Sequence, residues 1–226
     1  MDLNQYLLKN GKINFKEMKR YEIINRVIQS KGYKKYLEIG VRDGECITQV
    51  KCESKIGVDP NPLNSHTTHP ITSDDFFRSL GPDEKFDVIF IDGLHLDYQV
   101  TRDIENSLKH LSEGGTILLH DCNPPTIHHA MENPVFGPPA NGNWNGTVYL
   151  SLIDLRLYKK NLVLKTVNSD WGVGILTRGD SETLDVFPND AMNWEYFNSN
   201  RNKILDLITP EEFLNLYPVS ESVESI

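Results

Sequence analysis

The sequence predicts an α/β protein built on a doubly wound, mostly parallel sheet. Short apolar runs alternate along the chain with amphipathic stretches, which is the order expected of repeated strand and helix units. The clearest run, residues 86–92, is almost continuously apolar. Such a run is typical of a strand that is covered on both faces, as strands of parallel sheets are.

Each element follows from periodicity and from the residues that end it. Apolar residues recur at helical spacing through residues 1–33, and Gly32 is the expected stop. Gly114 and Gly115 are expected to end the helix that precedes the fourth strand. The predicted strands are 36–40, 55–59, 86–92, 116–121, 162–167 and 171–177, the last two as an antiparallel hairpin, and the predicted helices are 44–51, a helix that begins at 73–77, 97–111, 148–160 and 193–217.

Three parts are therefore expected: an N-terminal helical segment over 1–33, a central domain over 34–178, and a C-terminal helical tail over 179–226. Residues 123–147 interrupt the pattern with five prolines, three glycines and five asparagines. A loop of this length within a compact domain is usually functional. Because it directly follows a strand, we expect it to act as a lid over a site.

Composition limits the possible partners. The chain has 226 residues, a formal net charge of −9, 38% hydrophobic and 24% charged residues. This charge argues against nonspecific binding to nucleic acid or to an anionic membrane. Three cysteines provide no disulfide framework, and no signal peptide or membrane span is evident, so a cytoplasmic protein is expected. The helices at both ends could form a homodimer face.

The turn after the first strand is a candidate cofactor cradle. Gly40 and Gly44 let the backbone approach a ligand, and Asp59, 21 positions after Glu38, can accept both hydroxyls of a ribose. A dinucleotide fingerprint would place a glycine where Glu38 stands. A carboxylate would repel a pyrophosphate but tolerate the sulfonium of S-adenosylmethionine, so Glu38 favours the latter cofactor.

Acidic and imidazole side chains follow the next two strands. Asp92 and His95 come after one strand, and His120 and Asp121 after the other. Transfer of a methyl group to a hydroxyl requires removal of its proton, which a histidine can accept. Alternatively, Asp92 and Asp121 could bind Mg²⁺ or another divalent cation that acidifies the hydroxyl.

Five motifs in order resemble those of class I S-adenosylmethionine-dependent methyltransferases, over about residues 34–178. These motifs are Leu37–Cys46, Gly57–Pro60, Ser73–Phe77, Phe86–His95 and Gly114–Cys122. The resemblance implies a Rossmann-like, seven-stranded sheet with its last strand antiparallel. It also implies that Glu38 and Gly40 lie near the methionine part of the cofactor, Asp59 at the ribose and Asp74 near the adenine.

The acidic residues that follow two of the strands indicate which groups of methyltransferases the sequence resembles. Asp92 and Asp121 stand where catechol-type and natural-product sugar O-methyltransferases place metal-binding acids. His95 matches the Asp-Gly-x-His arrangement of macrolide sugar O-methyltransferases, in which the histidine is the base. Cys122 departs from the pattern, because a third acidic or amide ligand is expected there and thiols bind magnesium poorly. His120 or Asn123 is a possible substitute.

Two residues of loop 123–147 indicate that the acceptor of the methyl group is polyhydroxylated. Trp144 offers an aromatic face and Asn145 an amide, and the tract resembles one in methyltransferases of bacterial polysaccharide clusters. We therefore predict an O-methyltransferase that acts on a sugar hydroxyl or a glycosylated metabolite, with His120, Trp144 and Asn145 as candidate substrate contacts.

Three alternatives remain open. One is an NAD-linked oxidoreductase or epimerase, which Glu38 disfavours. A second is a noncatalytic domain that binds a glycan or a partner. A third is a metallohydrolase, which leaves the segment from Glu38 to Asp59 without a role and draws on six residues: Asp92, His95, His120, Asp121, His128 and His129.

Overall fold

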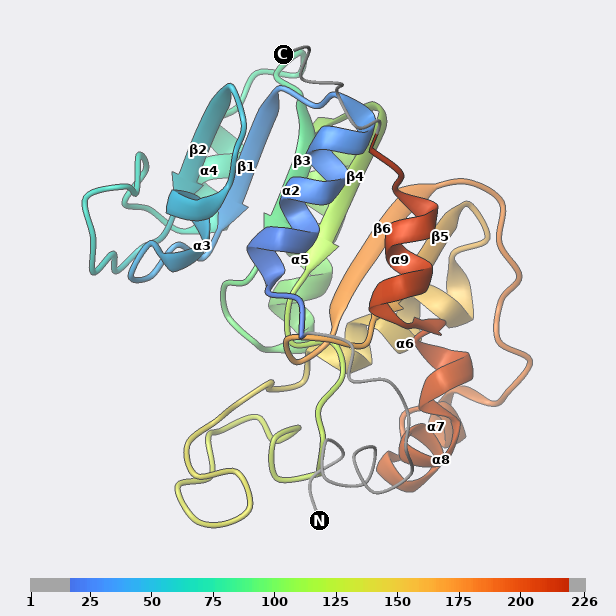
Figure 1. Cartoon of the computed structure of the whole chain (residues 1–226). Coiled ribbons are helices and arrows are strands. Elements are labelled where there is room, and N and C mark those ends of the chain that lie inside the picture. The colour runs from blue at the N-terminus through green and yellow to red at the C-terminus, as the bar shows by residue number, and fades with distance from the viewer. Residues whose placement is uncertain (1–16, 220–226) are drawn as a thin grey trace, which may run out of the picture.

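The computed structural model describes residues 17–219 (Figure 1). Residues 1–16 of the predicted N-terminal helical segment, and the last seven residues of the predicted tail, lie outside them. The elements in chain order are α2 (Arg20–Lys31), β1 (Lys35–Ile39), α3 (Glu45–Gln49), β2 (Ser54–Val58), α4 (Ser73–Ser79), β3 (Phe86–Ile91), α5 (Asp97–His110), β4 (Leu111–Leu119), α6 (Val148–Tyr158), β5 (Leu162–Val167), β6 (Val173–Arg178), α7 (Pro188–Ala191), α8 (Trp194–Ile204), β7 (Leu207–Ile208) and α9 (Pro210–Leu216).

The strands form one seven-stranded sheet in the order β2-β1-β3-β4-β6-β5-β7. Neighbours β2, β1, β3 and β4 run parallel, while β6 runs antiparallel to both β4 and β5. The predicted fold class is confirmed, and β6 is the antiparallel last strand of the central domain. The seventh strand, β7, comes from the C-terminal tail and pairs parallel to β5.

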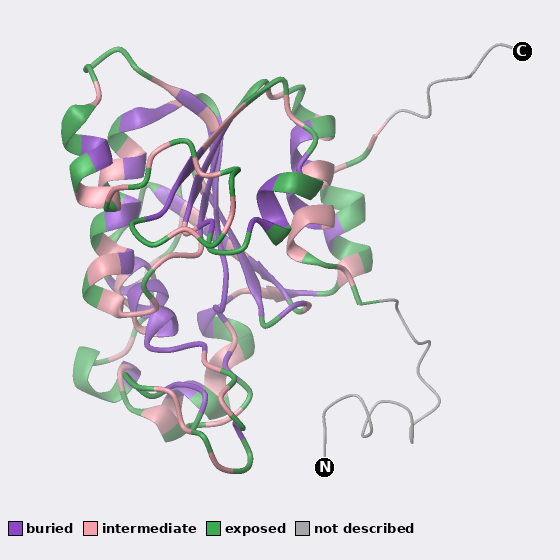
Figure 2. Cartoon of the chain, turned by 90° about the vertical axis from the view of Figure 1, so that its left-hand side faces the viewer, coloured by how far each residue is buried: buried purple, intermediate pink, exposed green. Residues whose placement is uncertain are grey.

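Helices cover both faces of the sheet, so the protein has two apolar cores (Figures 1 and 2). Tyr36 and Phe90 point into a core shared with α2, α3 and α9. Leu37 and Ile89, one position away in their strands, point into the core shared with α4, α5, α6 and α8. Successive strand residues thus face opposite cores, which explains why β3 is apolar throughout.

The tail differs from the single helix predicted over 193–217. α8 ends at Ile204, β7 adds two residues to the sheet, and α9 begins after Thr209. Thr209 accepts a hydrogen bond from the Glu212 amide and Pro210 stands at the first helical position, so a new helix starts there. Helical periodicity did not reveal this interruption because it is only a few residues long.

The glycine pair after α5 has another role than the one predicted. α5 ends at His110, and Gly114 and Gly115 lie inside β4. A Cβ atom on Gly115 would come within 2.9 Å of the Asp87 carbonyl oxygen. The pairing of β3 with β4 shifts register at this point, so the glycines permit a bulge rather than ending a helix.

No helix within residues 17–219 is both long and apolar enough to cross a membrane. Residues 123–147 contain neither helix nor strand, as predicted.

Candidate active site

The carboxyl ends of β1, β2, β3 and β4 lie at one edge of the sheet, because these strands are parallel neighbours. Loop 123–147 leaves β4 at the same edge and extends beyond it (Figure 1, yellow-green). Ligands of open α/β sheets bind outside this edge. The sequence-predicted site residues that follow these strands are therefore brought together.

The glycine turn after β1 is held by Asp59. One carboxylate oxygen of Asp59 accepts a hydrogen bond from the Arg42 amide at 2.7 Å, and the other accepts one from the Asn61 amide at 2.7 Å. Gly40 has φ +89°, and a Cβ atom there would collide with the main chain of Asp92. Gly40 thus allows the ends of β1 and β3 to pack closely, and Asp59 joins the cradle to the end of β2.

Glu38 lies beneath this cradle, with 1% of its surface exposed. The Tyr36 hydroxyl donates a hydrogen bond to its carboxylate, with an oxygen–oxygen distance of 2.5 Å. Burial raises the pKa of Glu38 to about 8, against the lowering effect of the Tyr36 hydrogen bond. The side chain is therefore mostly protonated at neutral pH. A buried acid at this position would ionise on the approach of a cation, so the site fits a sulfonium cofactor.

Asp74 lies in the first turn of α4. The N-cap of that helix is Thr72, whose hydroxyl accepts from the Asp75 amide. Asp74 instead faces α5, where it contacts Arg102 at 3.3 Å and Gln99 at 3.4 Å.

Asp92, His95 and Asp121 form the centre of the site. The Nε2 atom of His95 lies 3.3 Å from Asp92 Oδ1, and its Nδ1 atom lies 3.4 Å from Asp121 Oδ2 and 3.0 Å from the Trp144 carbonyl oxygen. The imidazole thus bridges two carboxylates from adjacent strands. Burial lowers the pKa of His95, but Asp92 and Asp121 outweigh it and raise the pKa above its ordinary value. His95 is then a stronger proton acceptor than a free histidine.

His120 is buried between the same acids. Its Nδ1 atom lies 3.1 Å from Asp121 Oδ2 and 3.3 Å from Asp92 Oδ1. Burial lowers the pKa of His120, but the Asp92 and Asp121 carboxylates raise it well above its ordinary value. Burial alone would raise the pKa of Asp92, yet His120 and His95 hold it well below its usual range. A charged His120 therefore keeps Asp92 ionised.

Two residues of the site were not predicted from the sequence. Arg20, the first residue of α2, places Nη1 2.9 Å from Asp92 Oδ2 and Nε 3.2 Å from Asp170 Oδ2. Asp170 Oδ1 in turn lies 3.7 Å from His120 Nε2. The sequence indicated only a turn at Asp170. One signal was available: residues before an antiparallel strand, here β6, lie at the carboxyl edge of the parallel strands.

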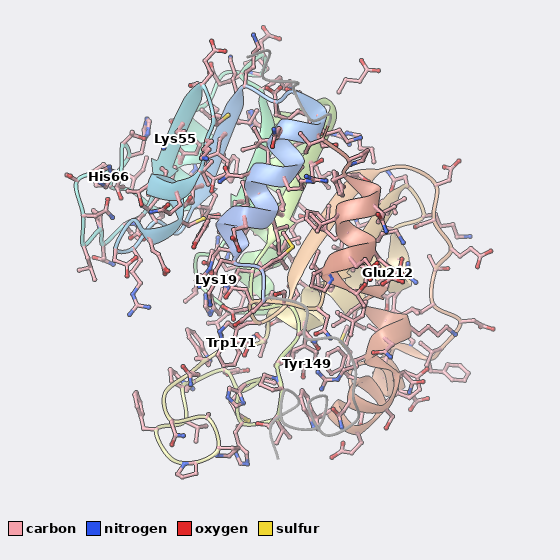
Figure 3. All side chains as sticks on the ribbon, viewed as in Figure 1. Lys19, Lys55, His66, Tyr149, Trp171 and Glu212 are labelled. Carbon is pink, nitrogen blue, oxygen red and sulfur yellow. The ribbon has the colours of Figure 1, made fainter. Side chains whose placement is uncertain are left out.

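Backbone strain accompanies these side chains. Asp121 has φ +59°, Asp170 +44° and Trp171 +65°. Non-glycine residues rarely adopt such angles, and they concentrate where a structure must aim particular groups. Figure 3 shows Trp171 near Lys19, the residue that precedes Arg20.

The end of loop 123–147 is built into the site. Trp144 stacks on His95 with ring centroids 5.0 Å apart, and the Thr147 amide donates to the His95 carbonyl oxygen at 2.9 Å. Asn145 is fully buried and donates through Nδ2 to Asp121 Oδ1 at 3.0 Å. Asn145, predicted as a substrate contact, thus holds Asp121, while Trp144 is partly exposed beside the histidine.

Cys122 and Asn123 do not supply the missing ligand beside Asp121. The buried Cys122 thiol donates to the carbonyl oxygens of Leu119 and His120. The Asn123 amide contacts Asn168 and Arg201 instead.

The two loop histidines of the metallohydrolase interpretation do not join Asp92, His95 and Asp121 in the cluster of potential metal ligands found within residues 17–219. His128 is exposed, and His129 is buried against Trp171 with Nδ1 2.9 Å from the Thr126 hydroxyl.

Potential ligands for a divalent cation are present at this site, but they already form hydrogen bonds and ion pairs with other side chains. Ligand atoms of Asp92, His95 and Asp121 lie within 4.8 Å of one another. However, Asp92 Oδ2 accepts from Arg20, Asp121 Oδ1 accepts from Asn145, and the two remaining carboxylate oxygens face His95 and His120. An added ion would have to displace Arg20, Asn145 or the protons through which the two histidines face the carboxylates, so the present arrangement does not fit one.

Comparisons with known proteins agree with this architecture. A family model described as a methyltransferase domain matches residues 53–122, from the start of β2 to the end of β4. The S-adenosylhomocysteine-bound methyltransferase PaMTH1 of Podospora anserina is 15% identical, with a TM-score of 0.52, over 71% of this chain and 78% of that one. No curated protein matches the sequence.

Two further solved structures are similar. The O-methyltransferase TomG of Streptomyces achromogenes, involved in tomaymycin synthesis and solved in complex with S-adenosylmethionine, is 10% identical with a TM-score of 0.50, over 78% of this chain and 87% of that one. A candidate caffeoyl-CoA O-methyltransferase of Staphylococcus aureus is 15% identical with a TM-score of 0.51, over 78% and 90%. These likenesses show that the chain has the Rossmann-like methyltransferase fold.

Proposed function

We propose that the protein is an S-adenosylmethionine-dependent methyltransferase that modifies a hydroxyl group of a sugar or a glycosylated metabolite. The observation that carries this proposal is the position of His95 between Asp92 and Asp121, at the sheet edge that also holds the glycine cradle. The match of residues 53–122 to a methyltransferase-domain model supports methyl transfer as the chemistry.

The cofactor side of the site is assigned to the ends of β1 and β2. Glu38 and the Gly40 to Gly44 turn would hold the methionine part, Asp59 the ribose and Asp74 the adenine side, with Asp92 next to them. When bound, S-adenosylmethionine supplies the methyl group as an electrophile on a cationic sulfur. Glu38 supports this assignment because it is a buried acid that gains a favourable partner when a cation arrives.

His95 is assigned as the general base. Its Nδ1 atom faces Asp121 and the Trp144 carbonyl oxygen, so Nε2, which now faces Asp92, would accept the proton of the acceptor hydroxyl. Asp92 and Asp121 hold the imidazole in place and stabilise its positive charge after the transfer. His120 contacts both carboxylates and Asn145 donates to Asp121, so these two residues keep the acids oriented.

The acceptor is assigned to a hollow that residues of loop 123–147 line. This hollow of about 350 Å³ is lined by Ala130, Met131, Glu132, Asn133 and Thr147. The Thr147 amide donates a hydrogen bond to the His95 carbonyl oxygen, so the hollow lies next to the proposed base, His95. Carboxylate and amide groups suit hydroxyl groups, and the partly exposed Trp144 ring suits the apolar face of a sugar. These features support a saccharide acceptor.

Calorimetry with S-adenosylhomocysteine tests the cofactor assignment. We expect binding to the wild type and to His95→Ala with similar affinity, because His95 lies on the acceptor side. Methyl transfer to nucleotide sugars and oligosaccharides, followed by mass spectrometry, should be lost in His95→Ala. Absence of S-adenosylhomocysteine binding would remove the proposal, and binding of reduced nicotinamide cofactor instead would favour an oxidoreductase.

A noncatalytic role in glycan binding is the second candidate, since the hollow alone could hold a saccharide. A glycan array with and without cofactor separates the two, because only a transferase adds one methyl group to its ligand.

A further inference from the structure

Arg20 is anchored more firmly than a surface arginine. Its backbone amide donates to Asp170 Oδ2 at 2.7 Å, which joins the start of α2 to the turn before β6. The preceding segment is also tied there, since the Met18 amide donates to Ser169 Oγ at 2.8 Å and that hydroxyl donates to the Met18 carbonyl oxygen at 2.9 Å. The guanidinium is therefore held in position before any ligand arrives.

The guanidinium supplies Asp92 with a positive partner that belongs to the protein itself. The Nη1 atom of Arg20 lies 2.9 Å from Asp92 Oδ2, the carboxylate oxygen that faces neither histidine. Asp170 fixes the other side of the group through Nε at 3.2 Å. An arginine stays charged under all ordinary conditions and presents its donors in a rigid fork. It thus supplies a permanent positive charge to the acid cluster.

We infer that Arg20 is the built-in counter-cation of this site and that the protein transfers methyl groups without a divalent metal ion. The inference rests on the proposed function, because it concerns how that site balances the charge of its acids. Arg20 is a positioning residue: it contacts Asp92 and Asp170, and it acts on the reaction by orienting Asp92 beside His95.

The other partners in the site agree with this inference. Asn145 already occupies one oxygen of Asp121, where a metal ligand would need to be free. The buried Asn145 Oδ1 atom has no hydrogen-bond partner among residues 17–219, and the NH₂ group of the same amide is turned toward Asp121. Cys122, beside Asp121, binds hard cations poorly. A metal ion that used all four oxygens of Asp92 and Asp121 would therefore need both Arg20 and Asn145 to move.

Binding of Mn²⁺ alone tests the inference without an acceptor. Free Mn²⁺ is measured by electron paramagnetic resonance in the wild type, Arg20→Gln, Arg20→Lys and Arg78→Gln. The last variant is the matched control, since Arg78 forms an exposed pair with Asp75 on α4. We expect Arg20→Gln to bind Mn²⁺ at least about tenfold more tightly than the other three proteins, which corresponds to about 1.4 kcal/mol.

The added affinity should disappear when Asp121→Asn is combined with Arg20→Gln, which would locate the ion at the acid cluster. If Arg20→Gln alone does not fold, Arg20→Gln combined with Asp170→Asn removes the unpaired carboxylate and carries the same expectation. Equal Mn²⁺ affinity of the wild type and Arg20→Gln, whether tight or absent, would overturn the inference.

S-adenosylhomocysteine calorimetry on the same proteins separates this result from the proposed function. Loss of ligand binding in the wild type would refute the methyltransferase, whereas the Mn²⁺ comparison would still report on Arg20. Where transfer is measurable, activity should survive a chelator, and loss of activity with the chelator would also overturn the inference.

Discussion

Replacing Glu38 by glutamine should make the protein more stable at alkaline pH. Glutamine keeps an oxygen that can accept the Tyr36 hydroxyl, but it cannot ionise. The wild-type side chain has its pKa raised from 4.5 to about 8 by burial. Between these values the folded chain holds a proton that the unfolded chain releases. The stability that Glu38 contributes is therefore complete below pH 4.5 and is lost as pH rises toward 8.

The magnitude follows from the shift of the pKa. At about 1.4 kcal/mol per unit, the full shift corresponds to roughly 5 kcal/mol, of which roughly 3 to 4 kcal/mol falls between pH 5 and pH 8. Urea unfolding of both proteins at these two pH values measures it. Because other titrating groups are common to both proteins, they cancel in the difference between wild type and variant.

Glu38→Gln should therefore lie close to the wild type in free energy of unfolding at pH 5 and exceed it by several kcal/mol at pH 8. Glu105→Gln, at an exposed position of α5, is the matched control for the change of residue type. A stability difference for Glu38→Gln that is the same at both pH values would refute the reasoning, since it would mean that Glu38 does not titrate in this interval.

Three other predictions address the chemical end of the site. Because its carboxylate neighbours raise the pKa of His95, the rate of methyl transfer should increase with pH, with an inflection above the ordinary histidine value of about 6.5, and a rate that falls over this range would contradict the base. Gly146→Ala should lower the free energy of unfolding, measured by thermal unfolding, by roughly 2 to 4 kcal/mol, since φ is +63° and the Cβ atom would collide with the His95 carbonyl. Gly137→Ala is the control and should be neutral, because open space surrounds that position. Equal effects of the two substitutions would contradict the contact between Gly146 and His95. Deletion of residues 134–143 should leave S-adenosylhomocysteine binding intact and abolish transfer, and full activity after the deletion would exclude a lid.

Much of the fold could be predicted because its signals are local. The apolar run of β3 indicated a strand covered on both faces, and parallel neighbours bring Asp92 and Asp121 to one edge. The same reasoning placed His95 beside them. The prediction for Gly114 and Gly115 was wrong, although it also used a local signal. The pair was interpreted as the end of a helix, but a β-bulge requires glycine just as strongly.

Arg20 and Asp170 could not be found by the same means. Arg20 precedes the first strand, and nothing in helical periodicity says which end of the sheet its helix start will approach. Asp170 stands in a turn, where an aspartate is common for reasons of turn geometry alone. The pair is 150 positions apart, and only the hairpin direction and the packing of α2 bring it together. Contacts of this range depend on tertiary structure rather than on residue pattern.

Asp92 and Glu38, two acids of the proposed cofactor side of the site, are held in opposite charge states. This difference indicates which of the two would respond to a bound cation. Asp92 is surrounded by Arg20, His95 and His120, so its carboxylate is ionised and already paired. Glu38 is buried with the neutral Tyr36 hydroxyl as its close partner, and the negative Asp92 raises its pKa further. A cation that enters the cradle gains little from Asp92, whose charge is balanced, but it can ionise Glu38. Separation of two pKa values within one site is how proteins assign different tasks to like groups. Under the proposed function, Asp92 would orient His95, and Glu38 would be the group that responds to the charge of the cofactor.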